Sequence, residues 1–277
     1  MFATLPIISA IIAIIVTVIV VIFVAQSNDG IRNSLLLHNE QLSAKALPSS
    51  TSSSPFSLIQ TIAIPNVNGR IDHMAIDIRD QRLFVAELGN NSLDIIDLKA
   101  GKRVRSISNN GLLNEPQSVI YIPELNRIFV SNGQDGTVDV FNAKSFSFIK
   151  KIKLASDDAD NMRYDPGSKL VYVGYGEGSL GIINATNYNV VGNIPLNGHP
   201  ESFQIEKETK ASSGQRQRIF VNVPQSNSVE VVDSQKRTVS KTWPIINAQN
   251  NFSMALDEAN HRLFVYWHKG SSKTYSF

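Results

Sequence analysis

Asp72 and His73 are adjacent in the stretch GRIDHMAID, residues 69–77, between a glycine turn and an alternating apolar segment. An acid beside an imidazole could form half of a catalytic dyad or supply two ligands of a metal ion. The same residue types recur in DADNMRYD and GHPESFQIE, at Asp160, Asn161, His199 and Glu201. Carboxylate and amide oxygens suit Ca²⁺ or Mg²⁺, and an imidazole adds a nitrogen ligand or a general base. These residues make one site only if the fold brings the three stretches together.

The three stretches belong to a repeat. RLFV-like segments recur at intervals of 45, 43, 48 and 44 residues, ending at Val85, Val130, Val173, Val221 and Val265. A polar insertion, KETKASSGQRQ at 207–217, explains the longest interval as a surface loop. Five copies at one period indicate a repeat array rather than a set of unrelated strands.

Each copy has the sequence pattern of four short strands. An apolar-x-apolar segment such as MAID precedes the RLFV-like segment, a Gly/Asn-rich turn follows, and two more alternating segments complete the copy. Four strands per period of roughly 45 residues predict a β-propeller of four-stranded antiparallel blades, an all-β fold. No long amphipathic helix interrupts the strands, which argues against a parallel α/β sheet. The predicted repeats lie near 58–107, 108–154, 155–196, 197–243 and 244–277.

The repeat alignment predicts that polar residues gather at one mouth of the central channel, where the first strand of each blade begins. Such convergence is the default hypothesis for a binding site. The residues predicted to bind a ligand there are Asp72, His73, Gln117, Asp160, Asn161, His199 and Glu201. Of these, Asp72, Asp160, Asn161 and Glu201 are candidate metal ligands, for Ca²⁺ or another divalent cation, and His73 and His199 are candidate general bases. The competing interpretation is structural, with the same groups capping strand ends.

The residue identities in the repeats are more specific than an alternation of apolar and polar residues. RLFVAELGNNSLDIIDLKAGK, DADNMRYDPGSKLVYVGYGEG and GHPESFQIE, within residues 62–265, resemble the YncE-type, YVTN-repeat β-propellers. These are related in shape to gluconolactonase-like and NHL propellers. The resemblance implies seven blades and little about activity. The related lactonases hold a divalent cation with Glu, Asn and Asp in this region, which implies a lactonase-like alternative. Their ligand pattern does not align with this sequence residue by residue.

Five repeats against an expected seven leave two interpretations of the C-terminal part. In one, the segment 56–64 supplies the outer strand of the fifth blade and KTYSF its third strand, so that a five-bladed ring closes. In the other, the chain is an incomplete seven-bladed array. The stretch HKGSSKTYSF lacks the Gly/Asn turn and the third-strand pattern of the other copies, and we therefore expect the second.

The N-terminal residues 1–57 are predicted to attach the protein to a membrane. Residues 5–25 form an uncharged apolar run long enough to cross a bilayer as a helix. A cleaved signal peptide is the competing interpretation. No Lys or Arg precedes the run and no good cleavage site follows it, so residues 1–25 are expected to be an anchor or an uncleaved signal. Residues 26–57 are polar and end in a Ser/Pro-rich linker. We expect a single-pass membrane protein with its propeller on the extracytoplasmic side.

Composition narrows the function classes. The net charge is +2 with no block of Lys and Arg, so nucleic acid is not an expected partner. The absence of cysteine excludes disulfides, thiolate metal sites and cysteine nucleophiles. We expect a module that binds an unknown protein or small molecule without catalysis. The alternatives are a divalent-metal-dependent lactonase or esterase acting at the channel mouth, and a truncated, inactive product.

Overall fold

A computed structural model describes residues 58–108, 111–206, 217–246, 250–267 and 273–276. Residues 64–277 form one compact unit of five antiparallel sheets joined in chain order. In the first two sheets the strands are β1 (Met74–Asp77), β2 (Arg82–Glu87), β3 (Ser92–Asp97), β4 (Lys102–Ile107), β5 (Pro116–Ile122), β6 (Arg127–Asn132), β7 (Thr137–Asn142) and β8 (Phe148–Lys153).

The third and fourth sheets repeat this arrangement, and the fifth has three strands within the described residues. Their strands are β9 (Met162–Asp165), β10 (Leu170–Tyr175), β11 (Ser179–Asn184), β12 (Val190–Pro195), β13 (Phe203–Ile205), β14 (Arg218–Val223), β15 (Ser228–Asp233), β16 (Thr238–Pro244), β17 (Asn251–Asp257), β18 (Arg262–Trp267) and β19 (Lys273–Ser276). The RLFV-like segments form the second strand of every sheet, as the repeat predicts.

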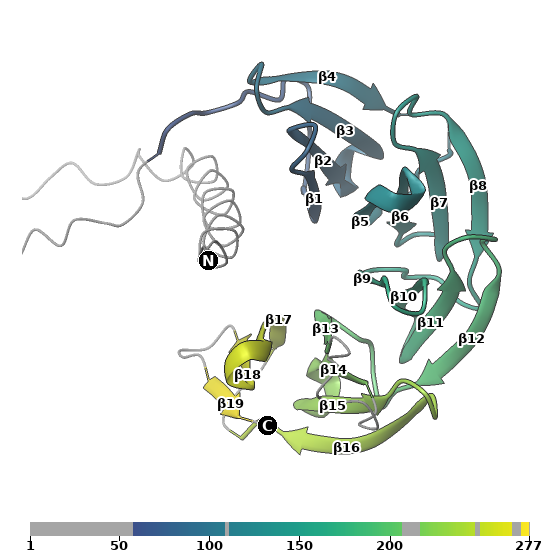
Figure 1. Cartoon of the computed structure of the whole chain (residues 1–277), viewed down its shortest axis with the longest axis vertical. Helices are drawn as coiled ribbons and strands as arrows, with labels where there is room; N and C mark the ends of the chain where they lie inside the picture. The colour runs from purple at the N-terminus through teal and green to yellow at the C-terminus, as the bar shows by residue number, and fades with distance from the viewer. Residues whose placement is uncertain (1–57, 109–110, 207–216, 247–249, 268–272, 277) are drawn as a thin grey trace, which may run out of the picture. The chain divides into compact units, whose positions relative to one another are not determined.

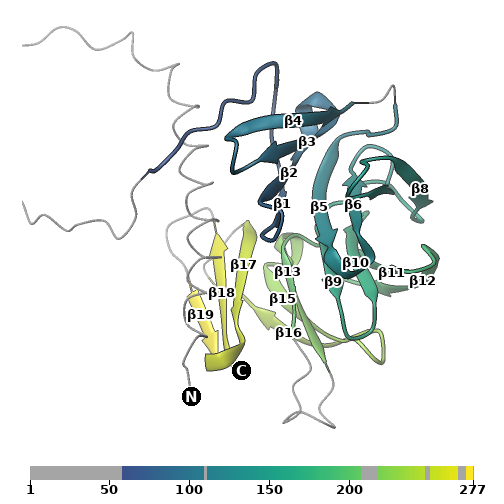
Figure 2. The same cartoon turned by 45° about the horizontal axis from the view of Figure 1, so that its top comes forward.

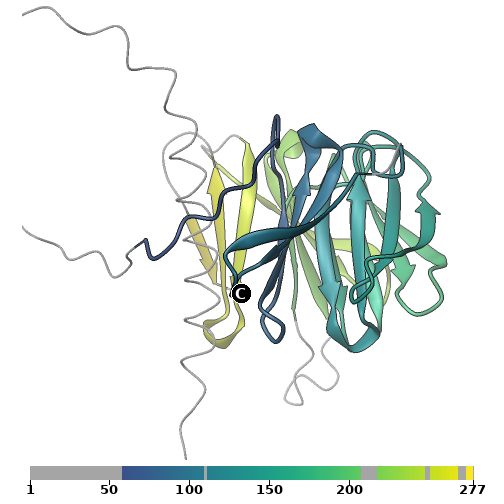
Figure 3. The same cartoon turned by 90° about the horizontal axis from the view of Figure 1, so that it is seen from above.

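The sheets are blades arranged around a common centre. The first strands β1, β5, β9, β13 and β17 lie innermost and contact one another in succession, whereas β4, β8, β12 and β16 lie outermost (Figure 1). Figures 2 and 3 show the sheets from other sides, each standing beside the next one along the chain. This arrangement confirms the prediction of a propeller-type all-β fold, and it brings the starts of the inner strands together.

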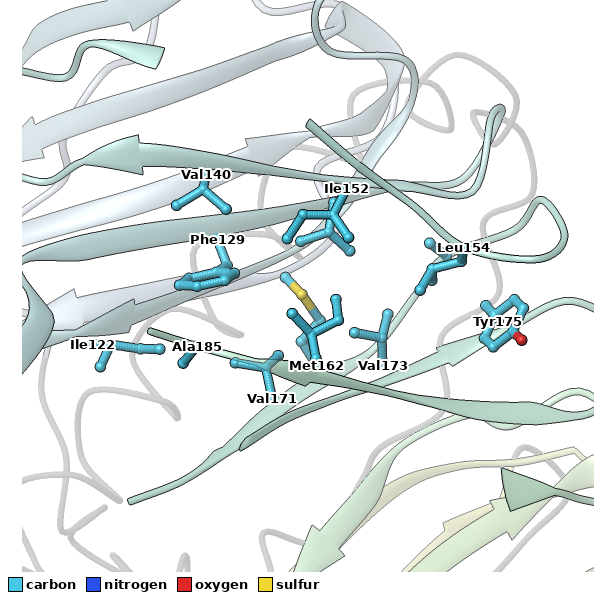
Figure 4. Close-up of a cluster of buried hydrophobic side chains, with 13 residues drawn as sticks. Ile122, Phe129, Val140, Ile152, Leu154, Met162, Val171, Val173, Tyr175 and Ala185 are labelled. Carbon is cyan, nitrogen blue, oxygen red and sulfur yellow. The ribbon is translucent and has the colours of Figure 1, made fainter. Parts of the chain in front are cut away.

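The cores lie between neighbouring blades. Between the second and third blades, Phe129 and Val140 pack against Met162, Val171 and Val173, all fully buried (Figure 4). Equivalent clusters join the other neighbouring pairs. Because strands alternate their side chains between two faces, each blade supplies one apolar face to each neighbour. Burial of each such side chain contributes about 2 kcal/mol. The second, third and fourth blades have such a cluster on both sides.

Aspartates at the ends of first strands fix the turns that follow. Asp77 accepts a hydrogen bond from the backbone N–H of Asp80 at 3.2 Å, and Asp257 accepts one from that of Asn260 at 3.3 Å. Asp165 does the same for Gly167 at 3.1 Å. These aspartates are therefore turn caps, as expected of Asp at such positions, and they take no part in the channel mouth.

Two predictions about the ends of the chain have different outcomes. The segment proposed to close a five-bladed ring has no strand in its described part, residues 58–64, so that outer strand is wrong for this structure. The third strand proposed for KTYSF does form, because β19 pairs with β18. The expected membrane span at 5–25 lies outside the described residues. Among the described residues, no helix is long and apolar enough to cross a membrane.

Candidate functional site

All seven residues predicted to bind a ligand line one cavity of about 660 Å³ at the centre of the blades. They come from the starts of inner strands in the first four blades and from the loops that lead into them. The cavity is larger than a single ion needs and falls in the range of small-molecule sites. The repeat alignment therefore located the residues that converge at this mouth.

A shared backbone pattern places these residues in register. In the first blade, Ala86 of β2 accepts a hydrogen bond from the N–H of Asp72 at 3.1 Å and donates one to the carbonyl of His73 at 3.0 Å. The same pair of bonds recurs in the third and fourth blades, at Asp160, Gly174 and Asn161, and at Glu201, Asn222 and Ser202. In these three blades the second strand thus fixes the two residues just before the inner strand, and both of them line the cavity.

In the second blade a bulge replaces this pattern. The register of β5 against β6 shifts between Pro116 and Val119, and Gln117 lies in the shifted segment. Its carbonyl accepts a hydrogen bond from the N–H of His73 at 3.1 Å, which ties the first blade to the second. Its side-chain amide donates to Asp158 of the third blade at 2.9 Å. Gln117 is therefore a link between blades and positions an acidic neighbour of the cavity.

The loop that carries Asp158 and Asp160 approaches the second blade closely because of one glycine. Gly136 has φ +58°, and a Cβ at this position would overlap the carbonyl oxygen of Ser156 and lie 2.6 Å from the Cα of Asp157. Only glycine combines this left-handed conformation with so close an approach. The loop is consequently pinned against the end of β7, just before the two acids.

Both histidines are held through the same ring nitrogen. Nδ1 of His199 lies 2.6 Å from the carbonyl oxygen of Gly176, and Nδ1 of His73 lies 3.1 Å from that of Gln117. A carbonyl oxygen can only accept a hydrogen bond, so each Nδ1 carries a hydrogen. When the ring is neutral, its Nε2 therefore has the lone pair. Metal-binding histidines are commonly oriented in this way by a backbone carbonyl. Nε2 of His199 faces Asp160, at 3.9 Å from its Oδ2.

Neighbouring carboxylates raise the pKa values of His199 and Glu201 in the cavity. Burial alone would lower the pKa of His199, but the neighbouring Asp160, the Gly176 carbonyl and Asp158 raise it to about 9. Burial, then the charge of Asp160, raises the pKa of Glu201 to about 7. In the ion-free protein at neutral pH, a protonated His199 therefore supplies the positive charge that these acids face. A bound metal ion would take over this role and displace the proton.

The pair from which the sequence argument began also forms. Nδ1 of His73 lies 3.3 Å from Oδ1 of Asp72, and the Arg70 guanidinium donates to Oδ2 of Asp72 at 2.5 Å. Burial opposes the charge of Asp72, but His73 and Arg70 outweigh it and lower the pKa of Asp72. Burial likewise opposes protonation of His73, and Asp72 and Asp160 raise its pKa.

Two buried oxygens in the cavity lack partners. Asp160 and Asn161 are only 7% and 2% exposed. Oδ1 of Asp160 and Oδ1 of Asn161 receive no hydrogen bond within the described part of the chain. Leaving such an acceptor unsatisfied costs about 1–3 kcal/mol, more for a charged group. Unlike the other unpartnered buried carboxylate and amide oxygens, these two belong to residues that line the cavity, where a ligand with positive charge could supply the missing partner.

The carboxylates and imidazoles fall into two groups with metal-ligand spacing. Asp72, His73 and Asp160 form one group, and Asp160, His199 and Glu201 form the other. Within each group the ligand atoms lie within 4.8 Å of one another. Five of the seven predicted residues therefore meet in potential metal groups, with Asn161 adjacent to their common member. Gln117 belongs to neither group.

Four cavity residues were not identified from the sequence: Arg70, Asp158, Glu177 and Gln225. Asp158 had a detectable signal, because it stands two residues before Asp160 in the acidic run DDAD at 157–160. The others lie in turns whose residues carry no repeat pattern. Glu177 is exposed at the rim and belongs to neither metal group.

Comparison with known proteins supports the fold and leaves the activity open. No model of a known protein family matches the chain. Antigen Lp49 of Leptospira interrogans serogroup Icterohaemorrhagiae serovar copenhageni is 29% identical over 104 residues, 34% of this chain and 21% of the antigen. The chain therefore spans only about a fifth of that relative.

Two solved structures have a similar fold. One is Kuenenia stuttgartiensis hydrazine synthase, with a TM-score of 0.61 and 17% identity over 74% of this chain and 58% of that chain. The other is the dihydro-heme d1 dehydrogenase NirN in complex with DHE, with a TM-score of 0.58 and 16% identity over 69% and 41%. These propeller-like neighbours support a propeller-type fold, and at such low identity they are informative about the fold alone.

Proposed function

We propose that this chain is a membrane-anchored binding module of the YVTN-repeat propeller type, whose central cavity binds a divalent cation on the extracytoplasmic side. The observation that carries the proposal is the pair of buried, unpartnered oxygens on Asp160 and Asn161. Both residues line a cavity in which carboxylates and two oriented histidines lie at metal-ligand spacing. The cavity leaves room beside the ion for a small oxygen-bearing ligand, which would complete the coordination.

The donor set favours a transition metal over calcium. From the sequence, the four oxygen ligands favoured Ca²⁺ or another divalent cation, with the imidazole of His73 or His199 as an additional ligand or a general base. The two groups each include an imidazole, and Nε2 of His199 faces Asp160, at 3.9 Å from its Oδ2. A mixture of imidazole and carboxylate suits Mn²⁺ or Zn²⁺, whereas calcium sites are built from oxygen ligands.

Metal titration tests the proposal directly. Metal-free full-length chain in detergent is expected to bind Mn²⁺ or Zn²⁺ in calorimetry and to unfold at a higher temperature with the ion present. Free ion at about 100 times its dissociation constant adds about 2.7 kcal/mol to the free energy of unfolding. Ca²⁺ is expected to give a smaller shift. No heat and no shift with any of the three ions would refute the cation site.

The anchor is the second part of the proposal, and residues 5–25 support it by their length and lack of charge. The full chain is expected to sediment with membranes and to be released by detergent, not by high salt or alkaline carbonate. A variant lacking residues 1–25 is expected in the soluble fraction. Protease added from outside should remove the propeller of the anchored form. A full chain released by carbonate, or a propeller protected from outside protease, would contradict the anchor or its orientation.

A metal-dependent hydrolase is the second candidate function. It is favoured by the size of the cavity, which accommodates a small ester or lactone next to the ion ligands. A bound divalent cation would supply Lewis-acid polarisation of the substrate carbonyl. Ion-dependent turnover of a simple lactone by the full chain would assign this function. Ligand binding without turnover would assign the binding module.

A further inference from the structure

We infer that the cavity binds two divalent cations, with Asp160 as the carboxylate that bridges them. This inference rests on the proposed cation site and specifies how many ions it takes. The two potential metal groups share one residue, Asp160. A carboxylate has two oxygens, and in two-metal sites a shared acid of this kind holds ions about 3.5–4 Å apart.

The two groups have the same composition. Each combines one imidazole with two carboxylates: His73 with Asp72 and Asp160, and His199 with Asp160 and Glu201. Each imidazole is oriented separately by its own backbone carbonyl, that of Gln117 or that of Gly176. A single ion would use one group and leave the other imidazole and its acid without a function at the same mouth.

The two oxygens of the shared carboxylate have different surroundings. Oδ2 of Asp160 faces His199, whose Nε2 is 3.9 Å away. Oδ1 is buried and has no hydrogen-bond partner in the described ranges. The second unpartnered oxygen, on the neighbouring Asn161, is likewise buried. Oδ2 therefore lies on the side of the His199 group. The bridging role assigns Oδ1, which has no other partner in the described ranges, to the ion of the His73 group.

The charge of the cavity also exceeds what one ion can balance. Its lining contains five carboxylates, on Asp72, Asp158, Asp160, Glu177 and Glu201, and one guanidinium, on Arg70. Arg163 lies close enough to interact with both His73 and Asp160 and adds a second positive charge. With neutral histidines these groups carry a net charge of −3, so one doubly charged cation leaves −1 and two leave +1. The charge of the cavity therefore admits a second cation. Like charges this close are unfavourable unless they are paired.

Ion counting in matched variants tests the inference. We expect metal analysis of the full chain after equilibrium dialysis against Mn²⁺ to give two ions per chain. Its electron paramagnetic resonance spectrum should be that of a spin-coupled Mn²⁺ pair. Glu201→Gln and Asp72→Asn each remove one acid from a different group, so each is expected to retain one ion with the six-line spectrum of isolated Mn²⁺. Glu177→Gln, which changes a lining acid outside both groups, should retain two.

The outcomes separate the inference from the proposal on which it rests. One ion in the full chain, lost in both Glu201→Gln and Asp72→Asn, would overturn the two-ion site and leave a single cation site. No bound ion in the full chain would overturn both. Two ions with uncoupled spectra would place them too far apart for a shared carboxylate and would also overturn the bridging role of Asp160. Circular dichroism of each variant shows that a lost ion does not reflect a lost fold.

Discussion

Asp160→Asn is expected to weaken cation binding more than about a hundredfold and to remove both ions, without lowering the melting temperature of the metal-free protein. Loss of residues that merely orient metal ligands already costs 10–100-fold in affinity, and Asp160 is the acid common to both groups. Asparagine keeps the shape and one oxygen but loses the charge and one of the two acceptors. Calorimetric titration with Mn²⁺ measures the loss of affinity.

The stability of the metal-free variant is the more discriminating half of this prediction. Asp160 is 7% exposed, and its charge helps to raise the pKa of Glu201 to about 7. Removing that charge relieves repulsion among the cavity acids, while the loss of its attraction to His199 offsets part of the gain. We therefore expect a melting temperature equal to or above that of the parent chain. A residue retained for stability would show the opposite.

Glu177→Gln is the matched control, because it removes one negative charge from the same cavity outside both metal groups. It is expected to change affinity less than tenfold, through the long-range field alone. If Glu177→Gln and Asp160→Asn weakened binding equally, the cavity would attract cations by its overall charge and would contain no built site. If Asp160→Asn unfolded the protein, the acid would have a structural role.

The convergence of the site could be predicted from the sequence because the repeats are regular. Inner strands begin at equivalent positions in each copy, so residues 88 positions apart, such as Asp72 and Asp160, could be assigned to one channel mouth. The backbone bonds that Ala86, Gly174 and Asn222 make with these positions explain why the assignment holds. For a residue within the repeat pattern, its position in the sequence predicted its position in the blade.

The details that give the site its chemistry were not accessible in this way. The orientation of His199 depends on the Gly176 carbonyl of another loop, and the position of Asp158 depends on the close approach that Gly136 permits. His199 stands where the other copies have Arg70, Glu115 and Asp158, so no repeat pattern encodes its contact. The approach at Gly136 has a counterpart at Gly178, where a Cβ would lie 2.7 Å from the carbonyl oxygen of Leu196, but the sequence pattern alone does not show that either glycine is in contact with a loop. The ring-closing strand at 56–64 failed for a related reason. Its described part, residues 58–64, forms no strand, and whether an alternating segment becomes a strand depends on the edge that the tertiary structure offers it.

Glu87→Gln is expected to make the protein more stable at pH 8 by on the order of 3 kcal/mol, and to have little effect near pH 4.5. Glu87 on β2 is fully buried beside Asp94 on β3. Burial, then the carboxylate of Asp94, raises the pKa of Glu87 to about 7 from an ordinary 4.5, against hydrogen bonds from Ser92 and Asn90. Urea denaturation of both proteins at a series of pH values measures the difference.

The sign follows from proton counting. Between about pH 4.5 and about pH 7 the unfolded chain loses the proton of Glu87 and the folded protein keeps it, so the free energy of unfolding falls as pH rises. The contribution is fully present below the unfolded pKa and is lost above the folded one. Glutamine cannot ionise, and its amide can donate to Oδ1 of Asp94, which has no partner among the described residues. Acids that do not interact with Glu87 titrate equally in both proteins and cancel in the difference.

Asp139 on β7 provides a contrast within the same fold. Burial raises its pKa to about 6, so it has the same sign as Glu87, but Nζ of Lys151 donates to its Oδ2 at 3.1 Å. Asp139→Asn relieves the buried charge and at the same time leaves Lys151 without this carboxylate, so its gain at pH 8 is expected to be smaller than that of Glu87→Gln. Equal gains would mean that burial alone determines both effects.

The prediction for Glu87 would be contradicted by parallel stability curves of the parent chain and Glu87→Gln across this pH range. Such curves would show that Glu87 is ionised in the folded protein. Arg103, which donates to Asp94 at 2.7 Å, would then compensate both acids.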